Sequence, residues 1–399
     1  MRICSVAYTY YEVDNRVMRY AEALAERGDH IDVLAVAKPG LKKFEIINGV
    51  HVYRVQTREI NEKGKFDYLF KLLFFLWNTF WILTWRTFRR RYDVIHIHSI
   101  PDFEVFAALI ARLMGTRVIL DIHDLVPEFF NSKFGKSEKS MFYKMLLWEE
   151  KLSMAFADHV IIANHLWEKT LYSRSLKPEK CSVYLNYPDP GIFRYRETPK
   201  PADEFRISFP GTLSWHQGVD ILVRAMKLIR ESHPECKLYV YGVGSERCKL
   251  IELAKDLKIN DDTVFFKDIL PIQDIANVMS SCHMGVVPKR KDSFGNEAFS
   301  TKIFEFMSLG VPVLVSDTKI DTYYFNEDCV KFFTSGDEQE LAEKLVYLIE
   351  HEDERNRLAK NSLEFIQQHN WDIHQGRYFE LVDTLAKHQQ LAPQLTGVK

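Results

Sequence analysis

Motifs that mark several common enzyme classes are absent from this chain of 399 residues. It has no D-x-D, H-E-x-x-H or C-x-x-C sequence, so no pattern predicts a bound divalent metal or a redox disulfide. No G-x-S-x-G elbow is present, which argues against a hydrolase built on that motif. No G-x-G-x-x-G follows the first predicted strand, which argues against an NAD enzyme. We therefore expect neither a metal nor a redox cofactor.

An excess of charge of either sign is also lacking. Lys and Arg total 53 against 55 Asp and Glu, and the formal net charge of -2 offers no global positive field to a nucleic acid. Six cysteines are scattered along the chain, which indicates free thiols in a reducing compartment. The N-terminus soon meets Glu12 and Asp14 and does not resemble a signal peptide, so we expect a cytoplasmic location.

Short β-rich runs alternate with helical patterns along the first half. The expected strands are 2–8, 31–37, 94–99, 117–124, 159–165 and 183–186, with helices between them, including 103–114 and 138–155. This alternation is typical of a doubly wound parallel sheet.

A second unit of the same kind is expected after residues 187–204, which contain four prolines and no apolar periodicity and are interpreted as a linker. Its strands are expected at 206–211, 237–244, 263–268, 284–288 and 311–316, and the chain turns helical after residue 337. The predicted fold class is α/β, with two Rossmann-like domains, 1–188 and 189–370, facing across a cleft.

Residues 63–91 break this pattern, because Phe, Leu and Trp crowd the segment and basic residues flank it. The cations are Lys63, Lys65, Lys71, Arg86, Arg89, Arg90 and Arg91. A helix of this composition is typical of an anchor lying in the interface of an anionic membrane. A spanning helix is the weaker interpretation, because Asp67, Asn78 and Thr79 interrupt the segment. A helix buried against the sheet is the remaining alternative.

The most specific constellation lies in residues 296–317. Ser300 and Thr301 are suited to cap a helix that begins near Lys302, and Gly310 with a following proline ends it. The start of such a helix offers free backbone N–H groups and the positive end of a dipole. The pattern therefore predicts a phosphate site.

Two carboxylates bracket this site. Glu297 precedes the helix start, and Glu305 follows it by about one turn. With the N–H groups from Phe299 to Lys302 between them, they are placed to hold sugar hydroxyls before the phosphates and a ribose behind them. Two surface glutamates beside an ordinary loop would be the simpler explanation if the spacing stood alone.

The two glutamates are separated by seven residues, and a small-residue stop and PVLVSD follow. This resembles the E-x7-E signature of retaining glycosyltransferases of family 4, which have the GT-B fold. Further segments resemble the same family in the same order: DNRVMRYAEALAERGDHIDV (14–33), YDVIHIHSIP (92–101), LDIHDLVPE (120–128), ADHVIIAN (157–164), PGTLSWHQGVDILVRAM (210–226) and YGVGSERCKL (241–250).

The resemblance implies an acceptor-binding first domain and a second domain that binds a nucleotide diphosphate sugar. It implies that Glu305 binds the ribose, that Glu297 faces the donor sugar and that His123 lies against the transferred sugar. The other donor-binding candidates are Lys302, Ser300, Thr301, Phe299, Gly211, Thr212, Gln217, Arg290 and Gly242. By the same resemblance, the last helix, about 371–388, packs back on the first domain.

Acceptor-side candidates are Asp14, Arg16, Asp124 and Glu128. A helix cap and a solvated arginine explain Asp14 and Arg16 equally well, and the other two are also suited to cap a loop.

The chain departs from the family at the G-R-L-x-x-x-K-G pattern, because the corresponding stretch has Thr212 and Gln217 in place of the two cations. A leaving nucleoside diphosphate gains charge in the transition state and needs a replacement for them. Lys302 and Arg290 are the candidates, although a solvated loop explains Arg290 equally well.

We expect a retaining, metal-independent glycosyltransferase, cytoplasmic and peripheral to the inner face of the membrane. It would move a sugar from a nucleotide diphosphate donor to a lipid-linked or membrane-proximal glycan of a surface polysaccharide. The alternatives are a GT-B enzyme of other chemistry, such as an epimerase or a phosphorylase, and a non-catalytic nucleotide-sugar-binding scaffold.

Overall fold

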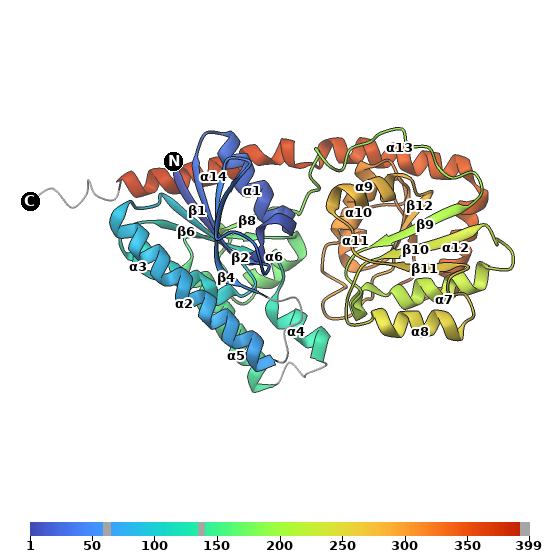
Figure 1. Ribbon diagram of the computed structural model, residues 1–399, viewed down its shortest axis with the longest axis horizontal. Helices are drawn as coiled ribbons and strands as arrows, with labels where there is room; N and C mark the ends of the chain where they lie inside the picture. Colours follow the sequence, from blue (N-terminus) through green and yellow to red (C-terminus); the bar gives the residue numbers. More distant parts are fainter. Residues whose placement is uncertain (59–64, 135–139, 392–399) are drawn as a thin grey trace, which may run out of the picture. The chain divides into compact units, whose positions relative to one another are not determined.

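The computed structural model describes residues 1–58, 65–134 and 140–391, which form two compact units (Figure 1). Unit 1 comprises Met1–Phe130, Lys136–Asn186 and His374–Lys399, and unit 2 comprises Asn131–Gly135 and Tyr187–Ile373. Each unit is an α/β domain built on a largely parallel sheet, as the strand and helix alternation predicted. All six cysteines are free thiols.

The sheet of unit 1 has the strand order β3-β4-β2-β1-β5-β6-β7-β8. Its strands are β1 (Arg2–Tyr10), β2 (His30–Ala37), β3 (Phe44–Ile47), β4 (Val50–Thr57), β5 (Val94–His98), β6 (Arg117–Ile122), β7 (His159–Ile162) and β8 (Cys181–Val183). Its helices are α1 (Asn15–Glu26), α2 (Lys65–Arg89), α3 (Leu109–Leu113), α4 (Val126–Phe134), α5 (Met141–Phe156) and α6 (His165–Tyr172), with 3-10 turns η1 (Tyr11–Val13), η2 (Asp102–Ala108) and η3 (Pro178–Lys180). In Figure 1, α2, α3 and α5 lie on one side of this sheet, and α1 lies on the other.

The sequence prediction missed the hairpin formed by β3 and β4, so the sheet is mixed rather than wholly parallel. Asn48 and Gly49 form its turn, both with positive φ, and Asn-Gly is the commonest pair in a tight hairpin. Three other boundaries also differ. The helix expected at 103–114 is divided into η2 and α3, and the strand expected at 183–186 is β8. The helix expected from 138 begins at Met141 after the Ser140 cap, and residues 138 and 139 lie outside the described part.

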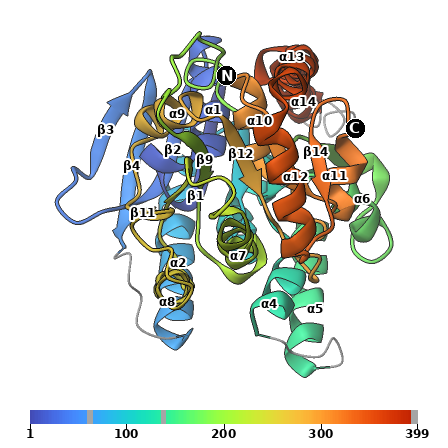
Figure 2. The ribbon, with the colours of Figure 1, turned by 90° about the vertical axis from the view of Figure 1, so that its right-hand side faces the viewer.

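The sheet of unit 2 is parallel throughout, with the order β11-β10-β9-β12-β13-β14. Its strands are β9 (Phe205–Pro210), β10 (Cys236–Tyr241), β11 (Val264–Lys267), β12 (Met284–Val287), β13 (Val313–Ser316) and β14 (Lys331–Phe333), the last of which was not predicted. Its helices are η4 (Trp215–Gln217), α7 (Val219–Ile229), α8 (Arg247–Asp256), α9 (Ile272–Ser280), α10 (Thr301–Ser308), α11 (Lys319–Tyr324), α12 (Glu338–Glu350) and α13 (Glu352–Gln368). Figures 1 and 2 show α7 and α8 on one side of the sheet, and α9, α10 and α13 on the other.

The last helix, α14 (Trp371–Leu391), belongs to unit 1 from His374 onward. Tyr378 is fully buried there, with its ring 4.5 Å from that of Tyr20 in α1. Arg27, which follows α1, forms an ion pair of 2.9 Å with Asp383. The end of the chain therefore packs on the first domain.

Helix α2 attaches to the unit 1 sheet by a narrow stripe of its surface. Leu72, Phe75, Thr79, Leu83 and Thr87 recur at helical spacing along this stripe and are buried. The opposite face, called here the aromatic face, is 46 to 70% exposed and consists of Leu69, Phe70, Leu73, Phe74, Trp77, Trp81, Trp85 and Phe88. The helix is long and apolar enough to cross a membrane by length and composition alone, but the buried stripe fixes it to the sheet. Residues 63 and 64 of the expected anchor lie outside the described part.

Candidate functional site

In unit 2, candidate residues converge where β9 and β12 end and α10 begins. Helix α10 starts at Thr301, and Ser300 occupies its cap position with extended backbone angles. The Ser300 side chain does not cap the helix, and its buried hydroxyl has no hydrogen-bond partner among the described residues. Gly310 ends the helix region with φ of +68°, as the sequence predicted. The first turn thus presents unpaired donors together with a hydroxyl that lacks a partner, a combination suited to an anion.

Lys302 brings a cation to this turn. Its Nζ donates a hydrogen bond of 2.9 Å to Gln217 Oε1, and it lies so close to Gly211 that a Cβ there would be 3.1 Å from Nζ. Burial lowers the pKa of Lys302, and Glu305 opposes this effect only in part. The ammonium is therefore short of compensating negative charge, which an anionic ligand would supply.

Glu305 lies on the same helix, one turn further on. Burial raises the pKa of its carboxyl group, while Lys302 and a hydrogen bond with Thr301 act in the opposite direction. This partly desolvated carboxylate is suited to accept hydrogen bonds from hydroxyl groups.

Glu297 lies in the loop before α10, which α11 holds in place. Lys319 bonds Glu297 through its side chain, and its backbone N–H donates to Asn296 Oδ1 at 2.9 Å. The buried Lys289 completes the clamp, because its Nζ donates to Ala298 O at 2.7 Å and pairs with Asp321 at 2.9 Å. The position of Glu297 is therefore fixed from two sides.

Other donor-side candidates have different surroundings. Arg290 is bonded to both carboxylate oxygens of Asp220 and stacks at 3.7 Å over the ring of Trp215. Its charge is compensated, so it is not the free cation that the sequence prediction considered. The Phe299 ring packs 4.8 Å from Phe304, which leaves its backbone as the group available to a ligand. Thr212 is exposed.

Gly242 has a packing role. A Cβ at this position, where φ is +152°, would lie 1.9 Å from the carbonyl oxygen of Gly211. The glycine therefore permits the loops after β9 and β10 to approach each other. This contact is sufficient to explain the residue without a ligand.

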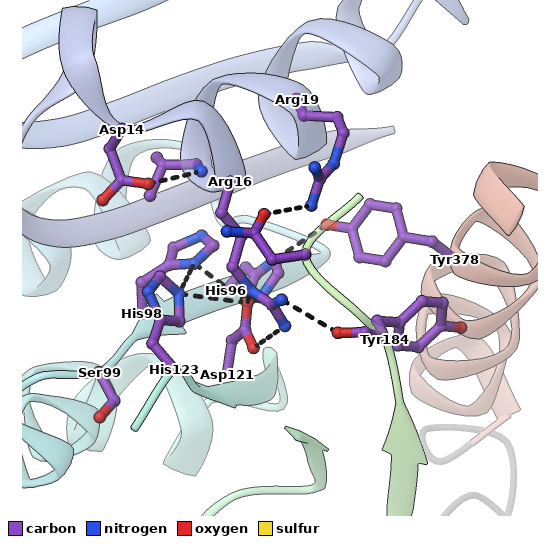
Figure 3. Close-up of polar contacts among 12 residues, drawn as sticks. Asp14, Arg16, Arg19, His96, His98, Ser99, Asp121, His123, Tyr184 and Tyr378 are labelled. Carbon is purple, nitrogen blue, oxygen red and sulfur yellow. Dashed lines mark hydrogen bonds and ion pairs between the residues drawn. The ribbon is translucent and has the colours of Figure 1, made fainter. Parts of the chain in front are cut away.

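In unit 1, candidate residues meet at the ends of β5 and β6 in a cluster called here the histidine cluster, consisting of His96, His98, Asp121, His123 and Arg16 (Figure 3). His98 and Asp121 are register partners on these neighbouring strands. The Asp121 Oδ2 atom lies 3.7 Å from His96 Nε2, 3.3 Å from His98 Nδ1 and 3.4 Å from His123 Nε2. His123 is 21% exposed, whereas the other members are almost fully buried.

A buried ion pair holds the centre of this cluster. Arg16 Nε and Nη2 donate to Asp121 at 2.8 and 2.6 Å, and its Nη1 donates to the carbonyl oxygen of Tyr184 at 3.0 Å. Burial would raise the pKa of Asp121, but Arg16, and next His123, hold it well below its usual range. Burial lowers the pKa of His96 and of His98. The cluster therefore contains a carboxylate anion facing neutral imidazoles.

The acceptor-side candidates divide into structural and available groups. Asp14 caps α1 by accepting from the backbone N–H of Val17 at 3.2 Å. Arg16 is 3% exposed and fully engaged, so it is not a solvated arginine. Glu128 is bonded to Arg174 at 2.6 and 3.0 Å. Asp124, beside His123, has a pKa that burial raises.

Two family models match this chain. One, described as a glycosyl transferase 4-like domain, matches residues 13–186, and the other, glycosyl transferases group 1, matches residues 194–365. The chain belongs to the group 1, family 4-type glycosyltransferases. The recognition from sequence is thereby confirmed, together with the GT-B fold and an enzymatic activity of this type.

Curated relatives of this glycosyltransferase are distant. One protein of the human phosphatidylinositol N-acetylglucosaminyltransferase is 25% identical over 324 residues, covering 78% of this chain and 61% of that protein. The O-antigen biosynthesis glycosyltransferase WclY of Escherichia coli is 25% identical over 256 residues, covering 61% of this chain and 66% of that protein. The chain thus spans less than two thirds of the length of these relatives.

Solved structures share the fold. Sucrose-phosphate synthase from Thermosynechococcus elongatus superposes with a TM-score of 0.78 at 19% identity, over 100% of both chains. Anabaena HepE in complex with UDP superposes with a TM-score of 0.68 at 18% identity, also over 100% of both chains.

The sequence interpretation of this glycosyltransferase missed the residues that hold its candidates in place. These are Lys319, Lys289 and Asp321 in unit 2 and Asp121 and His98 in unit 1. A lysine directly after the predicted strand 311–316 and its SDT sequence was a visible signal for Lys319. No local signal marked Asp121, because its partner Arg16 lies 105 positions away.

Proposed function

We propose that this glycosyltransferase retains anomeric configuration while moving a sugar from a nucleotide diphosphate donor to a lipid-linked or membrane-proximal glycan. The observation that carries the donor assignment is the partnerless hydroxyl of Ser300 at the start of α10, next to Lys302. A diphosphate would bond this hydroxyl and the first backbone N–H groups, and it would gain from the helix dipole. A protein of the same fold has been solved with UDP, which supports this choice of ligand.

We assign the neighbouring groups by the chemistry each offers. Glu305 accepts from the ribose hydroxyls, and Glu297, fixed by Lys319, accepts from hydroxyls of the donor sugar. Lys302 replaces the two missing cations and stabilises the negative charge that develops on the leaving diphosphate. Its hydrogen bond to Gln217, the residue at one of the missing cation positions, aims the ammonium at the Gly211 loop.

The proposed chemistry needs no nucleophile from the protein. The bond from the anomeric carbon to the phosphate oxygen breaks while the acceptor oxygen bonds the same carbon on the same face. The acceptor hydroxyl proton passes to the leaving phosphate oxygen. His123 contacts the transferred sugar, and Asp124 contacts the acceptor.

The acceptor class is inferred from the aromatic face of α2. Eight large apolar side chains lie 46 to 70% exposed there, and each would contribute about 1 kcal/mol on entering a lipid interface. Arg89 stacks at 4.0 Å over the ring of Trp85, which puts positive charge beside the apolar surface, and such charges contribute about 1 kcal/mol each at an anionic membrane. Helix α5 extends the surface with Met141, Met145 and Trp148, which are 87, 52 and 65% exposed.

The names of relatives agree with a lipid-linked acceptor. One belongs to a phosphatidylinositol N-acetylglucosaminyltransferase, and another is named as acting on a diphospho-undecaprenol glycan. We propose that this enzyme works on the cytoplasmic side of a membrane, in surface polysaccharide synthesis.

Donor binding is tested by thermal shift and calorimetry with UDP, GDP, ADP and their sugars. One nucleotide should stabilise the protein at millimolar concentration. Glu305→Ala should weaken its binding roughly 10- to 100-fold, the value of one or two hydrogen bonds to a charged group. Glu343→Ala, an exposed glutamate on α12, is the matched control and should bind normally. Equal affinity in the two variants would refute the donor assignment.

The acceptor assignment is tested with vesicles and with product analysis. Wild-type protein should sediment with phosphatidylglycerol vesicles, and a variant with Trp77, Trp81 and Trp85 replaced by Ser should not. Ile269→Ser, a 71% exposed residue of unit 2, is the control. Loss of neither binding nor transfer in the triple variant would refute the membrane role. A radiolabelled donor separates transfer to extracted lipids from epimerisation or phosphorolysis.

A further inference from the structure

His123 has two ring nitrogens in very different surroundings. Its Nε2 lies 3.4 Å from Asp121 Oδ2 and 3.2 Å from His98 Nδ1, inside the cluster of Figure 3. Its Nδ1 has no hydrogen-bond partner among the described residues, and 21% of the side chain is exposed. One nitrogen is therefore committed to the protein, and the other remains for a ligand.

The Asp121 carboxylate decides which nitrogen carries the proton. Two Arg16 nitrogens bind it at 2.6 and 2.8 Å and keep it ionised in a fully buried position. An unprotonated Nε2 would direct a lone pair at this anion, whereas an Nε2–H donates to it. A neutral imidazole has a single N–H, so Nδ1 must then be the acceptor.

His98 is compatible with the same arrangement. It is fully buried and neutral, and its ring stacks 4.1 Å from that of His96. With a lone pair on Nδ1 it shares the proton of His123 Nε2, and with a proton on Nδ1 it donates to Asp121. Only a protonated Nδ1 facing an unprotonated His123 Nε2 would favour the other tautomer, and the anion opposes that state.

We propose that Asp121 and Arg16 are positioning residues that fix His123 as the Nε2–H tautomer. His123 Nδ1 is then a hydrogen-bond acceptor, which selects a hydroxyl group of the sugar or acceptor rather than a phosphate or carbonyl oxygen. This last step rests on the proposed function. The tautomer itself does not depend on it.

The decisive measurement is the tautomer in the wild-type protein. With ¹⁵N-labelled histidine, two-bond ¹H–¹⁵N spectra at pH 8 should show His123 as Nε2–H by more than about tenfold, and His123→Gln assigns its signals. An Nδ1–H form in the wild type overturns the proposal. Because this readout needs neither donor nor acceptor, it stands even if no transfer is found, which would refute the proposed function alone.

Asp121→Asn tests the cause. The amide can donate to Nε2, so the Nδ1–H form should gain at least about tenfold in population. An exchange of this kind in a serine protease lowers kcat about 10⁴-fold because the wrong tautomer results. Here we expect a loss of roughly 10² or more in kcat with the donor KM changed much less. An unchanged tautomer in this variant overturns the proposal.

The matched control is Asp32→Asn in the same sheet. Asp32 is also a buried carboxylate, 1% exposed, and it bonds Arg86 at 2.8 Å. Its loss should affect stability without moving the His123 signals or kcat. If Asp121→Asn does not fold, Arg16→Lys retains the charge but not the two-point contact, and it should broaden or shift the His123 equilibrium while Asp32→Asn does not. A shift of the same size in the control overturns the assignment.

Discussion

The two candidate corners of this glycosyltransferase treat charge in opposite ways. In unit 1, all three terminal donor groups of Arg16 are used, by Asp121 and by the Tyr184 carbonyl. In unit 2, the hydroxyl of Ser300 has no partner among the described residues, and burial lowers the pKa of Lys302. Both corners lie at the carboxyl ends of parallel strands, where ligands of such folds bind.

The difference indicates two kinds of role. A saturated ion pair makes a rigid frame, because any movement of Arg16 would leave a buried charge unpaired. An unsaturated corner is held at a cost that a ligand removes, so it is organised to bind. Buried polarity in this enzyme therefore serves geometry in one unit and affinity in the other.

The largest predicted effect breaks the frame. Arg16→Met should lower the free energy of unfolding by about 3 to 5 kcal/mol, because Asp121 is left buried without a partner. Lys302→Met should change it by no more than about 1 kcal/mol, because Glu305, whose pKa is already raised, takes up a proton in response. Urea unfolding followed by far-ultraviolet circular dichroism measures both.

Activity should show the reverse pattern for Lys302. Its Met variant should fold normally and lose turnover, whereas Lys302→Arg retains the charge and part of the rate. Equal destabilisation by the Arg16 and Lys302 variants would mean that both corners are structural, and the comparison would fail.

Sequence patterns predicted the parts of each corner that are local. The cap position, the helix start and the Gly310 stop follow from residue types within ten positions, and the structure places them nearly as expected. Strand positions were also legible, because buried parallel strands are short apolar runs. The Asn48-Gly49 hairpin was equally legible but was missed.

Long-range partners were not predictable in this way. His98 meets Asp121 because β5 and β6 pair in one register, and a shift of one residue would turn these side chains to opposite faces. Arg290 looked like a free cation until α7 supplied Asp220, 70 positions away. Local patterns therefore identified which groups are present, while the register and the helix packing decide which of them are already paired.

The second prediction concerns pH and sharpens the description of the unsaturated corner. Burial lowers the pKa of Lys302 in the free enzyme, and a bound diphosphate raises it, so binding takes up a proton. Affinity for the nucleotide diphosphate should therefore fall as pH rises through the lowered value, by about tenfold between about pH 7 and about pH 10. Calorimetry across this range measures it.

The arginine variant is the control for this pH dependence. Arg stays protonated throughout, so Lys302→Arg should bind with little change over the range. Lys302→Met should bind weakly and show the same flat profile. A wild-type profile as flat as that of the arginine variant would mean that Lys302 does not face the phosphates.

The smallest predicted effect decides whether Asp14 belongs to the frame or to the binding side. If its role is to cap α1, Asp14→Ala should cost about 1 kcal/mol of stability and Asp14→Asn much less, with kcat and both KM values unchanged. Asn keeps the cap, because its oxygen still accepts from Val17, but it removes the charge. A rise in the acceptor KM in Asp14→Asn, without loss of stability, would instead assign the carboxylate to the acceptor. Because the cap uses only one carboxylate oxygen, Oδ1, the second oxygen is the atom that this comparison of Ala and Asn isolates.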